Sequence, residues 1–230
     1  VFVFRAMEPA DLAILFLGIA FGLALVRCLA WARRRIGFGK RSHQAIPGRR
    51  PVKTLVVLGS GGHTMEMLQL LRGWELGTKY EVTFVVAATD TTSQGKVEAV
   101  LAERADAQDL MPTLRFLKLP RSREVGQSYI SSVATTIYAL GAATRMVFQE
   151  TPDMVLVNGP GTCVPVVAAA LILELVTGHY LCVVFVESVC RAETLSVTGK
   201  LLLAVVDRFV VHWKQLAEKY QKAEYFGVLC

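Results

Sequence analysis

The sequence lacks most of the patterns that would assign it to a common class of enzyme. It has no GxSxG nucleophile elbow, no GK[ST] ending of a P-loop, no cysteine beside a histidine and no cluster of metal ligands. Covalent hydrolysis, P-loop nucleotide hydrolysis and metal-based hydrolysis are therefore disfavoured, and we expect no metal and no cofactor. No internal repeat or low-complexity tract is present, so the 230 residues fit one domain plus an appendage.

Cysteine and asparagine are also scarce. Five cysteines stand at positions 28, 163, 182, 190 and 230, an odd number without a CxxC spacing. Reduced thiols in a cytosolic protein fit this pattern best. Asn158 is the only asparagine and Gly-Pro follows it, so the chain has no N-glycosylation sequon. This absence agrees with a main domain that faces the cytosol.

A long apolar run lies near the N-terminus. No polar side chain occurs from Leu12 to Val26, and Arg27 is the only charge before Ala32. A helix over residues 12–32 would be about 30 Å long, which matches the hydrocarbon core of a bilayer. We expect a transmembrane anchor at 12–32 with residues 1–11 in the lumen. A cleaved signal peptide is the alternative, but the residues before the run are not net positive.

The segment 33–53 is strongly basic. It holds eight Lys or Arg and no Asp or Glu, which exceeds the net charge of +6 of the whole chain. The positive-inside rule places this juxtamembrane linker and the following residues in the cytosol. The segment either only sets topology or also favours anionic lipid headgroups. No basic face recurs further on, so no nucleic acid is expected as a partner.

Beyond the linker, short β-branched apolar runs alternate with helical patterns. Strands are expected at Thr54–Leu58, Val82–Ala87, Leu114–Leu119, Met154–Val157, Tyr180–Val186 and Phe209–His212. Helices are expected at His63–Arg72, Gln94–Arg104, Ser128–Gln149, Cys163–Val176, Leu195–Val205 and Lys214–Gln221. Near-continuous apolar strands are typical of a parallel sheet that is buried on both faces. Residues 54–222 therefore predict an α/β, Rossmann-like, doubly wound and mostly parallel sheet.

Ligand sites in such sheets lie outside the carboxyl ends of the strands. Four loops at these ends carry polar chemistry: Gly59–Thr64, Ala88–Gln94, Asn158–Pro165 and Glu187–Thr194. We expect them to share one rim.

The first of these loops reads GSGGHT and precedes a helix. Glycines let the backbone approach a ligand, and the helix N-terminus favours an anion such as phosphate. Thr64 stands where the dinucleotide fingerprint requires a third glycine, so that match is broken. A tight turn without a ligand is the plain alternative. Asp90 after the second strand leaves a nucleotide-dependent oxidoreductase as another alternative.

Two residues could act on a substrate proton. A helix N-terminus disfavours an imidazolium, so a neutral His63 could bond a hydroxyl or serve as general base, or be structural. Glu187 ends an apolar strand, which would carry it to the rim. Arg191 or the His63 loop could be its partner, and a structural Glu187–Arg191 ion pair is the alternative.

The C-terminal residues 223–230 form an apolar tail. Such a tail either folds back onto its own domain or inserts into a groove of a partner.

Taken together, LGSGGHTMEML, NGPGTCVP, FVESVCRAETLSVTGKLLL and DRFVVHW resemble the membrane-anchoring subunit of the UDP-N-acetylglucosamine transferase of asparagine-linked glycosylation. The match runs from about residue 12 to the C-terminus. A more distant similarity is to the N-terminal half of the bacterial transferase that adds N-acetylglucosamine to a lipid-linked peptidoglycan precursor. Gly62-His63 matches its glycine loop, and of its His-Glu-Gln-Asn segment only Glu187 is kept, so roles for the flanking residues are not carried over.

The resemblance implies the N-terminal half of a GT-B glycosyltransferase that binds dolichyl-diphosphate-linked N-acetylglucosamine at the cytosolic face of the endoplasmic reticulum membrane. UDP-N-acetylglucosamine would bind mainly to a separate soluble subunit, without which no activity is expected. His63 or Glu187 would be the base. The acceptor or its diphosphate would meet Gly59, Ser60, Gly61, Gly62, Thr64, Asn158, Gly159, Gly161, Thr162, Ser188 and Arg191. Tyr225, Phe226, Val228 and Leu229 would dock the partner. A scaffold that only recruits a self-sufficient enzyme is the alternative.

Overall fold

The computed structural model describes residues 25, 28–32, 51–121, 129–159 and 161–229, with the backbone alone for 129–133. The chain divides into two compact units, Val1–Gly37 and Phe38–Cys230. In the first unit, Leu25 and residues 28–32 are helical. None of the helices in the described residues has the length and apolar character needed to cross a bilayer. The expected anchor at 12–32 and linker at 33–53 fall mostly outside those residues.

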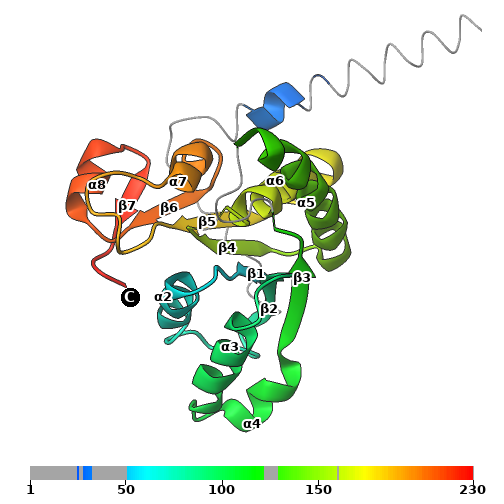
Figure 1. The fold of residues 1–230 in the computed structure, drawn as a ribbon, viewed down its shortest axis with the longest axis vertical. Coiled ribbons are helices and arrows are strands. Elements are labelled where there is room, and N and C mark those ends of the chain that lie inside the picture. Colours follow the sequence, from blue (N-terminus) through cyan, green and yellow to red (C-terminus); the bar gives the residue numbers. More distant parts are fainter. Residues whose placement is uncertain (1–24, 26–27, 33–50, 122–128, 160, 230) are drawn as a thin grey trace, which may run out of the picture. The chain divides into compact units, whose positions relative to one another are not determined.

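The second unit is built on one parallel sheet (Figure 1). Its strand order is β3-β2-β1-β4-β5-β6-β7, and every pair of neighbours is parallel. The strands are β1 (Val52–Val57), β2 (Tyr80–Ala87), β3 (Arg115–Leu119), β4 (Met154–Asn158), β5 (Cys182–Val186), β6 (Arg208–Val211) and β7 (Ala223–Tyr225). The doubly wound sheet is confirmed, and the order reverses direction between β1 and β4, where such folds bind ligands.

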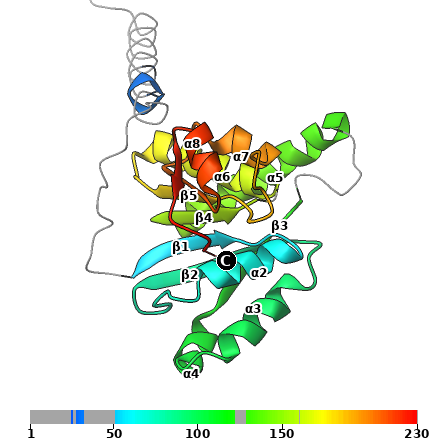
Figure 2. The same cartoon turned by 90° about the vertical axis from the view of Figure 1, so that its left-hand side faces the viewer.

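Helices cover both faces of the sheet (Figure 2). One layer holds α2 (Gly62–Leu70), α3 (Ser93–Ala102) and α4 (Ala107–Leu110). The 3-10 turn η1 (Met111–Thr113) directly follows α4. The other holds α5 (Tyr129–Glu150), α6 (Cys163–Thr177), α7 (Val197–Leu202) and α8 (Lys214–Lys219). Helix α6 ends at Gly178, which takes the left-handed conformation (φ 75°) that glycine allows.

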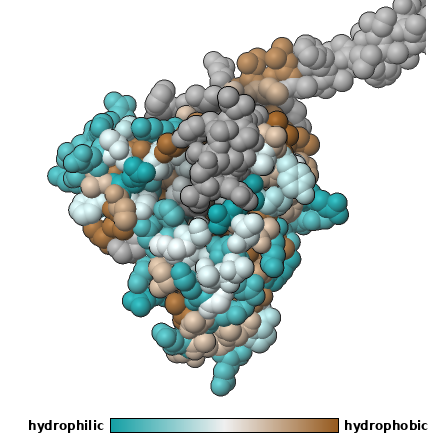
Figure 3. Space-filling model, viewed as in Figure 1, coloured by the Kyte–Doolittle hydropathy of each residue, from teal (hydrophilic) through white to brown (hydrophobic). Residues whose placement is uncertain are grey.

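The two edge strands, β3 and β7, differ from the central ones. Arg115 and Lys118 of β3 are exposed, and β7 has only three residues. Arg208 of β6 pairs with Glu224 of β7 through two hydrogen bonds. Around β7 and the following residues, apolar surface gathers in the space-filling view (Figure 3).

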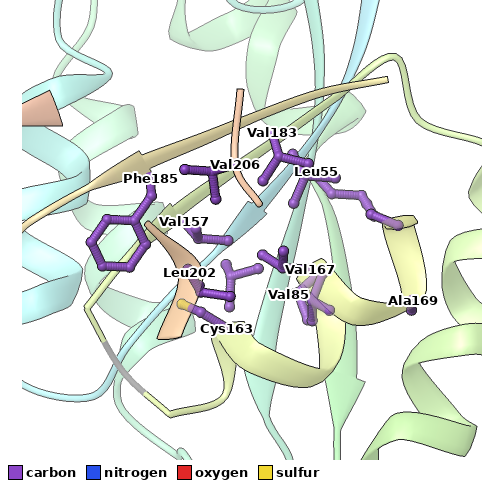
Figure 4. Packing of buried hydrophobic residues seen from close by; sticks show 14 of the residues in the cluster. Leu55, Val85, Val157, Cys163, Val167, Ala169, Val183, Phe185, Leu202 and Val206 are labelled. Atoms are coloured by element: carbon purple, nitrogen blue, oxygen red, sulfur yellow. The ribbon is translucent and has the colours of Figure 1, made fainter. Parts of the chain in front are cut away.

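The core forms two clusters because alternate strand residues point to opposite faces. Leu55 and Val57 of β1 join the cluster under α5 and α6, whereas Val56 and the following Leu58 join the cluster under α2 and α3. Figure 4 shows part of the first cluster, in which Cys163 at the start of α6 lies near Leu202 of α7 and Val157 of β4.

The main differences from the sequence prediction concern β7, α4, η1 and α7. Strand β7 and the short α4–η1 segment were not predicted, and α7 is shorter than the expected Leu195–Val205. Strand β7 reads AEY, so it offers no apolar run, and its pairing depends on β6 alone. Helix α7 begins after Ser196, whose side chain accepts the Gly199 N–H, because a serine cap ends the preceding loop.

Candidate functional site

The site is built around the loop that joins β1 to α2. Gly61 has φ +72°, a conformation that side chains rarely adopt, and it turns the chain into the helix. Ser60, Gly61 and Gly62 are exposed, and no side chain caps the helix. The free N–H groups of the first turn therefore face outward, as an anion site requires.

Thr64 does not share this exposure. Its side chain is fully buried, its hydroxyl donates to the Gly59 carbonyl and it lies 2.7 Å from the Ser93 hydroxyl. Thr64 therefore shapes the glycine turn from inside and is not placed to touch a ligand.

The loop after β2 is tied to the same network. The Asp90 carboxylate accepts the Ser93 hydroxyl at 2.6 Å and the N–H groups of Thr92 and Ser93 at 3.0 Å. Burial alone would raise the pKa of Asp90, but these hydrogen bonds outweigh it and lower the pKa from its usual value. Asp90 thus stabilises the start of α3, a structural use of the residue that had suggested an oxidoreductase.

His63 lies against the loop after β4. Its Nδ1 is 2.9 Å from Asn158 Oδ1, and Asn158 is fully buried. Gly159 has φ +68°, and a Cβ there would come within 2.7 Å of His63 Cε1. Only glycine lets this backbone approach the imidazole, so the structure brings the first and second glycine turns together at His63.

The centre of the polar network is Glu66, which the sequence reasoning missed. Its Oε1 accepts the Ser188 hydroxyl at 2.8 Å, and its Oε2 accepts the Asn158 amide at 3.0 Å and lies 3.4 Å from His63 Nδ1. Glu66 thereby links the loops after β1, β4 and β5. Its signal in the sequence was the three-residue spacing from His63, which places both on one side of a helix.

Glu187 does not reach the rim, which corrects the expectation that its strand would carry it there. It has no exposed surface, and its carboxylate accepts the Ser188 N–H at 3.1 Å and the Ser196 N–H and hydroxyl at 2.9 and 3.0 Å. A Cβ on Gly199 would collide with Glu187 Oε2. The carboxylate therefore supports the start of α7 from the interior.

Arg191 is exposed, and its backbone N–H donates to the Ser188 carbonyl. The bonds of the Glu187 carboxylate go to Ser188 and Ser196, so the alternative of a Glu187–Arg191 ion pair is not what this structure contains. Arg191 instead offers a cation on the loop beside the buried network.

The second glycine turn continues into α6. Gly161 is exposed, whereas Thr162 is nearly buried and Cys163 fully so. Burial raises the pKa of the Cys163 thiol, so it stays protonated and unreactive. Across the described residues, no three His, Cys, Asp or Glu side chains gather as metal ligands.

The tail reaches the same rim from the edge of the sheet that β7 forms. The Leu229 N–H donates to Nδ1 of the buried His212 at 3.2 Å, and His212 also bonds the Glu187 backbone. Burial lowers the pKa of His212, although the Glu66 charge and the Glu187 bond oppose this. The Arg208 guanidinium lies 5.3 Å from the Phe226 ring.

The tail therefore folds back onto its own domain, and its insertion into a groove of a partner stays a prediction. Its backbone is held to its own domain by β7 and by His212, while apolar side chains stay exposed. The exposed fractions are 42% for Tyr225, 56% for Phe226, 55% for Val228 and 40% for Leu229.

The sheet order and the site at the strand carboxyl ends define a Rossmann-like α/β protein. MurG from Acinetobacter baumannii superposes with a TM-score of 0.51 at 14% identity, over 70% of this chain and 41% of MurG. A UDP co-structure of Staphylococcus aureus MnaA superposes with a TM-score of 0.51 at 17% sequence identity, over 77% of this chain and 44% of MnaA. The chain thus spans about two fifths of those structures. The likeness is one of fold, as the distant bacterial resemblance predicted.

The chain belongs to the Alg14 family. The family model for the oligosaccharide biosynthesis protein Alg14 matches residues 54–229. Relatives named UDP-N-acetylglucosamine transferase subunit ALG14 are 42% identical in rat, over 81% of this chain and 87% of theirs. The human relative is 42% identical over 84% of this chain and 89% of its own length. The relative from Yarrowia lipolytica is 38% identical over 86% of this chain and 88% of its own length. The expected family is confirmed.

Proposed function

We propose that this chain is the membrane-anchored, acceptor-side subunit of a two-component UDP-N-acetylglucosamine transferase. It adds the second N-acetylglucosamine to N-acetylglucosaminyl-diphospho-dolichol at the cytosolic face of the endoplasmic reticulum membrane. The observation that carries the proposal is that relatives named as transferase subunits match over most of both chains, while this chain has only one Rossmann-like sheet in its described residues. A separate soluble subunit supplies most of the UDP-sugar site.

In this proposal the acceptor diphosphate binds at the two glycine turns. Ser60, Gly61 and Gly62 present exposed backbone around an uncapped helix start, with Gly159, Gly161 and Thr162 on the neighbouring loop. Gly59 is buried and supports this turn through the bond from Thr64. Backbone N–H groups stabilise the anionic oxygens, and exposed Arg191 adds a positive charge. Thr64, Asn158 and Ser188 lie behind this surface and hold its shape.

His63 is the proposed base. It takes the proton from the 4-hydroxyl of the acceptor sugar as that oxygen attacks the anomeric carbon of the donor. The bond between the anomeric carbon and the diphosphate oxygen breaks with inversion, and UDP leaves with the electron pair. The ring is partly exposed, with 36% of the side chain accessible, so it can meet a substrate. Fully buried Glu187 is the weaker candidate for this role.

The exposed apolar side chains of Tyr225, Phe226, Val228 and Leu229 dock the soluble subunit. Their backbone is already held in place, which lowers the ordering cost of binding. The N-terminal anchor and the basic linker hold the assembly at the membrane.

A pair of glycine substitutions tests the proposal. Gly62 in α2 and Gly95 in α3 both have room for a side chain, because no heavy atom lies within 4 Å of the point where a Cβ would stand. We expect Gly62→Leu to fold but to block acceptor binding, and Gly95→Leu to keep normal turnover. The assay follows labelled sugar from UDP-N-acetylglucosamine to the dolichol-linked acceptor, with the full chain and its soluble partner purified from membranes.

Three results would contradict the proposal. No transfer by the wild-type complex overturns the activity, and full turnover of Gly62→Leu supports a pure scaffold instead. Saturable NAD binding by the purified chain would favour the oxidoreductase. His63→Ala in the same assay tests the base, because normal turnover of that variant excludes it.

A further inference from the structure

We infer that Glu66 and Asn158 are positioning residues that hold His63 with its proton on Nδ1 and its lone pair on Nε2. The inference rests on the proposed role of His63 as the base, and it assigns functions to two residues behind the substrate surface. It follows from the donor and acceptor capacity of each group along one chain of hydrogen bonds.

The chain starts at the Glu66 carboxylate, which can only accept hydrogen bonds when ionised. Its side chain is 12% exposed and receives the Ser188 hydroxyl on one oxygen and the Asn158 amide on the other. The side chain is thus fixed from two loops, and the Asn158 atom that faces it must be a hydrogen-bond donor.

This requirement for a donor sets the orientation of the Asn158 amide. Its Nδ2 lies 3.0 Å from Glu66 Oε2, and the reverse orientation would place two oxygens at this distance, which is repulsive. Its Oδ1 therefore faces His63 Nδ1 at 2.9 Å. A carbonyl oxygen cannot donate, so His63 Nδ1 must carry the hydrogen.

A neutral imidazole with a hydrogen on Nδ1 has its lone pair on Nε2. This is the nitrogen left for the acceptor hydroxyl, because Nδ1 is engaged and Gly159 packs against Cε1. When Nε2 takes the proton, the positive imidazolium lies 3.4 Å from Glu66 Oε2, within a partly buried site. The same carboxylate therefore selects the competent tautomer and stabilises the protonated base.

Few titratable groups face this network among the described residues. His63 and Glu66 come from α2, and His212, after β6, interacts with Glu66. Glu187 lies behind Ser188 with its carboxylate bonded to the start of α7. His212 is the other titratable group that interacts with Glu66, so the pH profile of Glu66→Gln should be compared with the pH profile of a His212 variant.

The direct test is the tautomer of His63 in the complex of the full chain with its unlabelled partner. Nitrogen NMR of the four ¹⁵N-labelled histidines, with His63→Gln for assignment, separates the two forms. We expect the hydrogen on Nδ1 in the wild type and a mixture of tautomers in Glu66→Gln. A wild-type His63 with the hydrogen on Nε2 overturns the inference, whatever the variants do.

Kinetics provide the second readout. We expect Glu66→Gln to lower kcat by about 100-fold or more with a smaller change in the acceptor KM, since a neutral amide no longer orients or stabilises the base. The acid limb of its pH profile should shift to lower pH. Glu98→Gln is the matched control, because Glu98 in α3 also accepts a side-chain amide, from Gln94 at 2.9 Å, away from the site.

The outcomes separate this inference from the proposed function. If His63→Ala loses turnover while Glu66→Gln keeps its kcat, pH profile and tautomer, the positioning role of Glu66 is wrong and the assignment of His63 as base stands. If His63→Ala keeps normal turnover, the base assignment fails, and the tautomer measurement still decides whether Glu66 and Asn158 orient the ring. Thermal unfolding of each variant shows whether a loss of turnover comes from a loss of fold.

Discussion

At the scale of single residues, Gly159 has the most demanding position in the site. Its φ of +68° is left-handed, and a Cβ would come within 2.7 Å of His63 Cε1. Left-handed backbone costs an alanine about 1–2 kcal/mol, and the clash adds displacement of the ring. We predict that Gly159→Ala lowers turnover about 100-fold, as expected when His63, the proposed base, is misplaced by about an ångström.

Gly77→Ala is the control for this prediction. Gly77 has a similar φ of +78°, but the nearest contact of a Cβ there is an ordinary 3.7 Å to Leu110. Gly77→Ala should lose only the thermal stability that left-handed backbone costs, Gly159→Ala at least as much, and only Gly159→Ala should lose turnover in the transfer assay. Equal turnover of the two would show that contact with His63 has no consequence.

At the scale of elements, Glu187 connects β5 to the start of α7. Its carboxylate receives three hydrogen bonds, and an amide in its place would set an NH₂ group against one of these donors. We predict that Glu187→Gln lowers the free energy of unfolding by about 1–3 kcal/mol. Chemical denaturation measures this, with the exposed Glu193→Gln of the same loop as control. An unchanged free energy would leave Glu187 without a structural role.

The pairing of β7 with β6 provides a second prediction at this scale. Arg208 and Glu224 are each about one third exposed, so their ion pair contributes below about 1 kcal/mol to global stability. Its local effect is larger, because β7 has only three residues. We predict faster hydrogen exchange of residues 223–229 in Arg208→Glu, and recovery in the double variant Arg208→Glu with Glu224→Arg. Faster exchange that persists in the double variant would contradict the pairing argument.

The same scale shows what the sequence could predict. The five central strands were predicted because β-branched apolar runs mark strands buried on both faces, and Val56 and Phe84 are fully buried. Strand β7 carries no such run. Glu66 was missed because its partners, Asn158 and Ser188, are 92 and 122 residues away and only the folded sheet brings them together. The inward direction of Glu187 likewise depends on Gly199, which leaves room for its carboxylate.

At the scale of the whole molecule, the buried His212 makes stability depend on pH. Burial lowers the pKa of His212 below the ordinary 6.5. As the pH falls through that value, the unfolded chain therefore binds more protons than the folded chain does. The contribution to the free energy of unfolding is therefore present above about pH 6.5 and is lost below it. Protonation also removes the acceptor of the Leu229 N–H.

We predict that the free energy of unfolding decreases between pH 7 and pH 5 (about the range in which histidine titrates) and that the decrease is smaller in His212→Gln. Denaturant titrations at several pH values measure it. His179→Gln serves as control, because His179 is bonded to the Pro152 carbonyl away from the site. An identical slope in the wild type and His212→Gln would assign the dependence to other groups.

The outer strands of the sheet also affect how the molecule behaves at high concentration. Exposed sheet edges act as templates for further strands, and 53% of this chain is hydrophobic. Here one edge carries exposed Arg115 and Lys118, and the other ends in a strand of three residues that contains Glu224. Charge and shortness both oppose strand addition. The domain should therefore resist edge-to-edge aggregation during synthesis, even though apolar side chains of its tail are exposed.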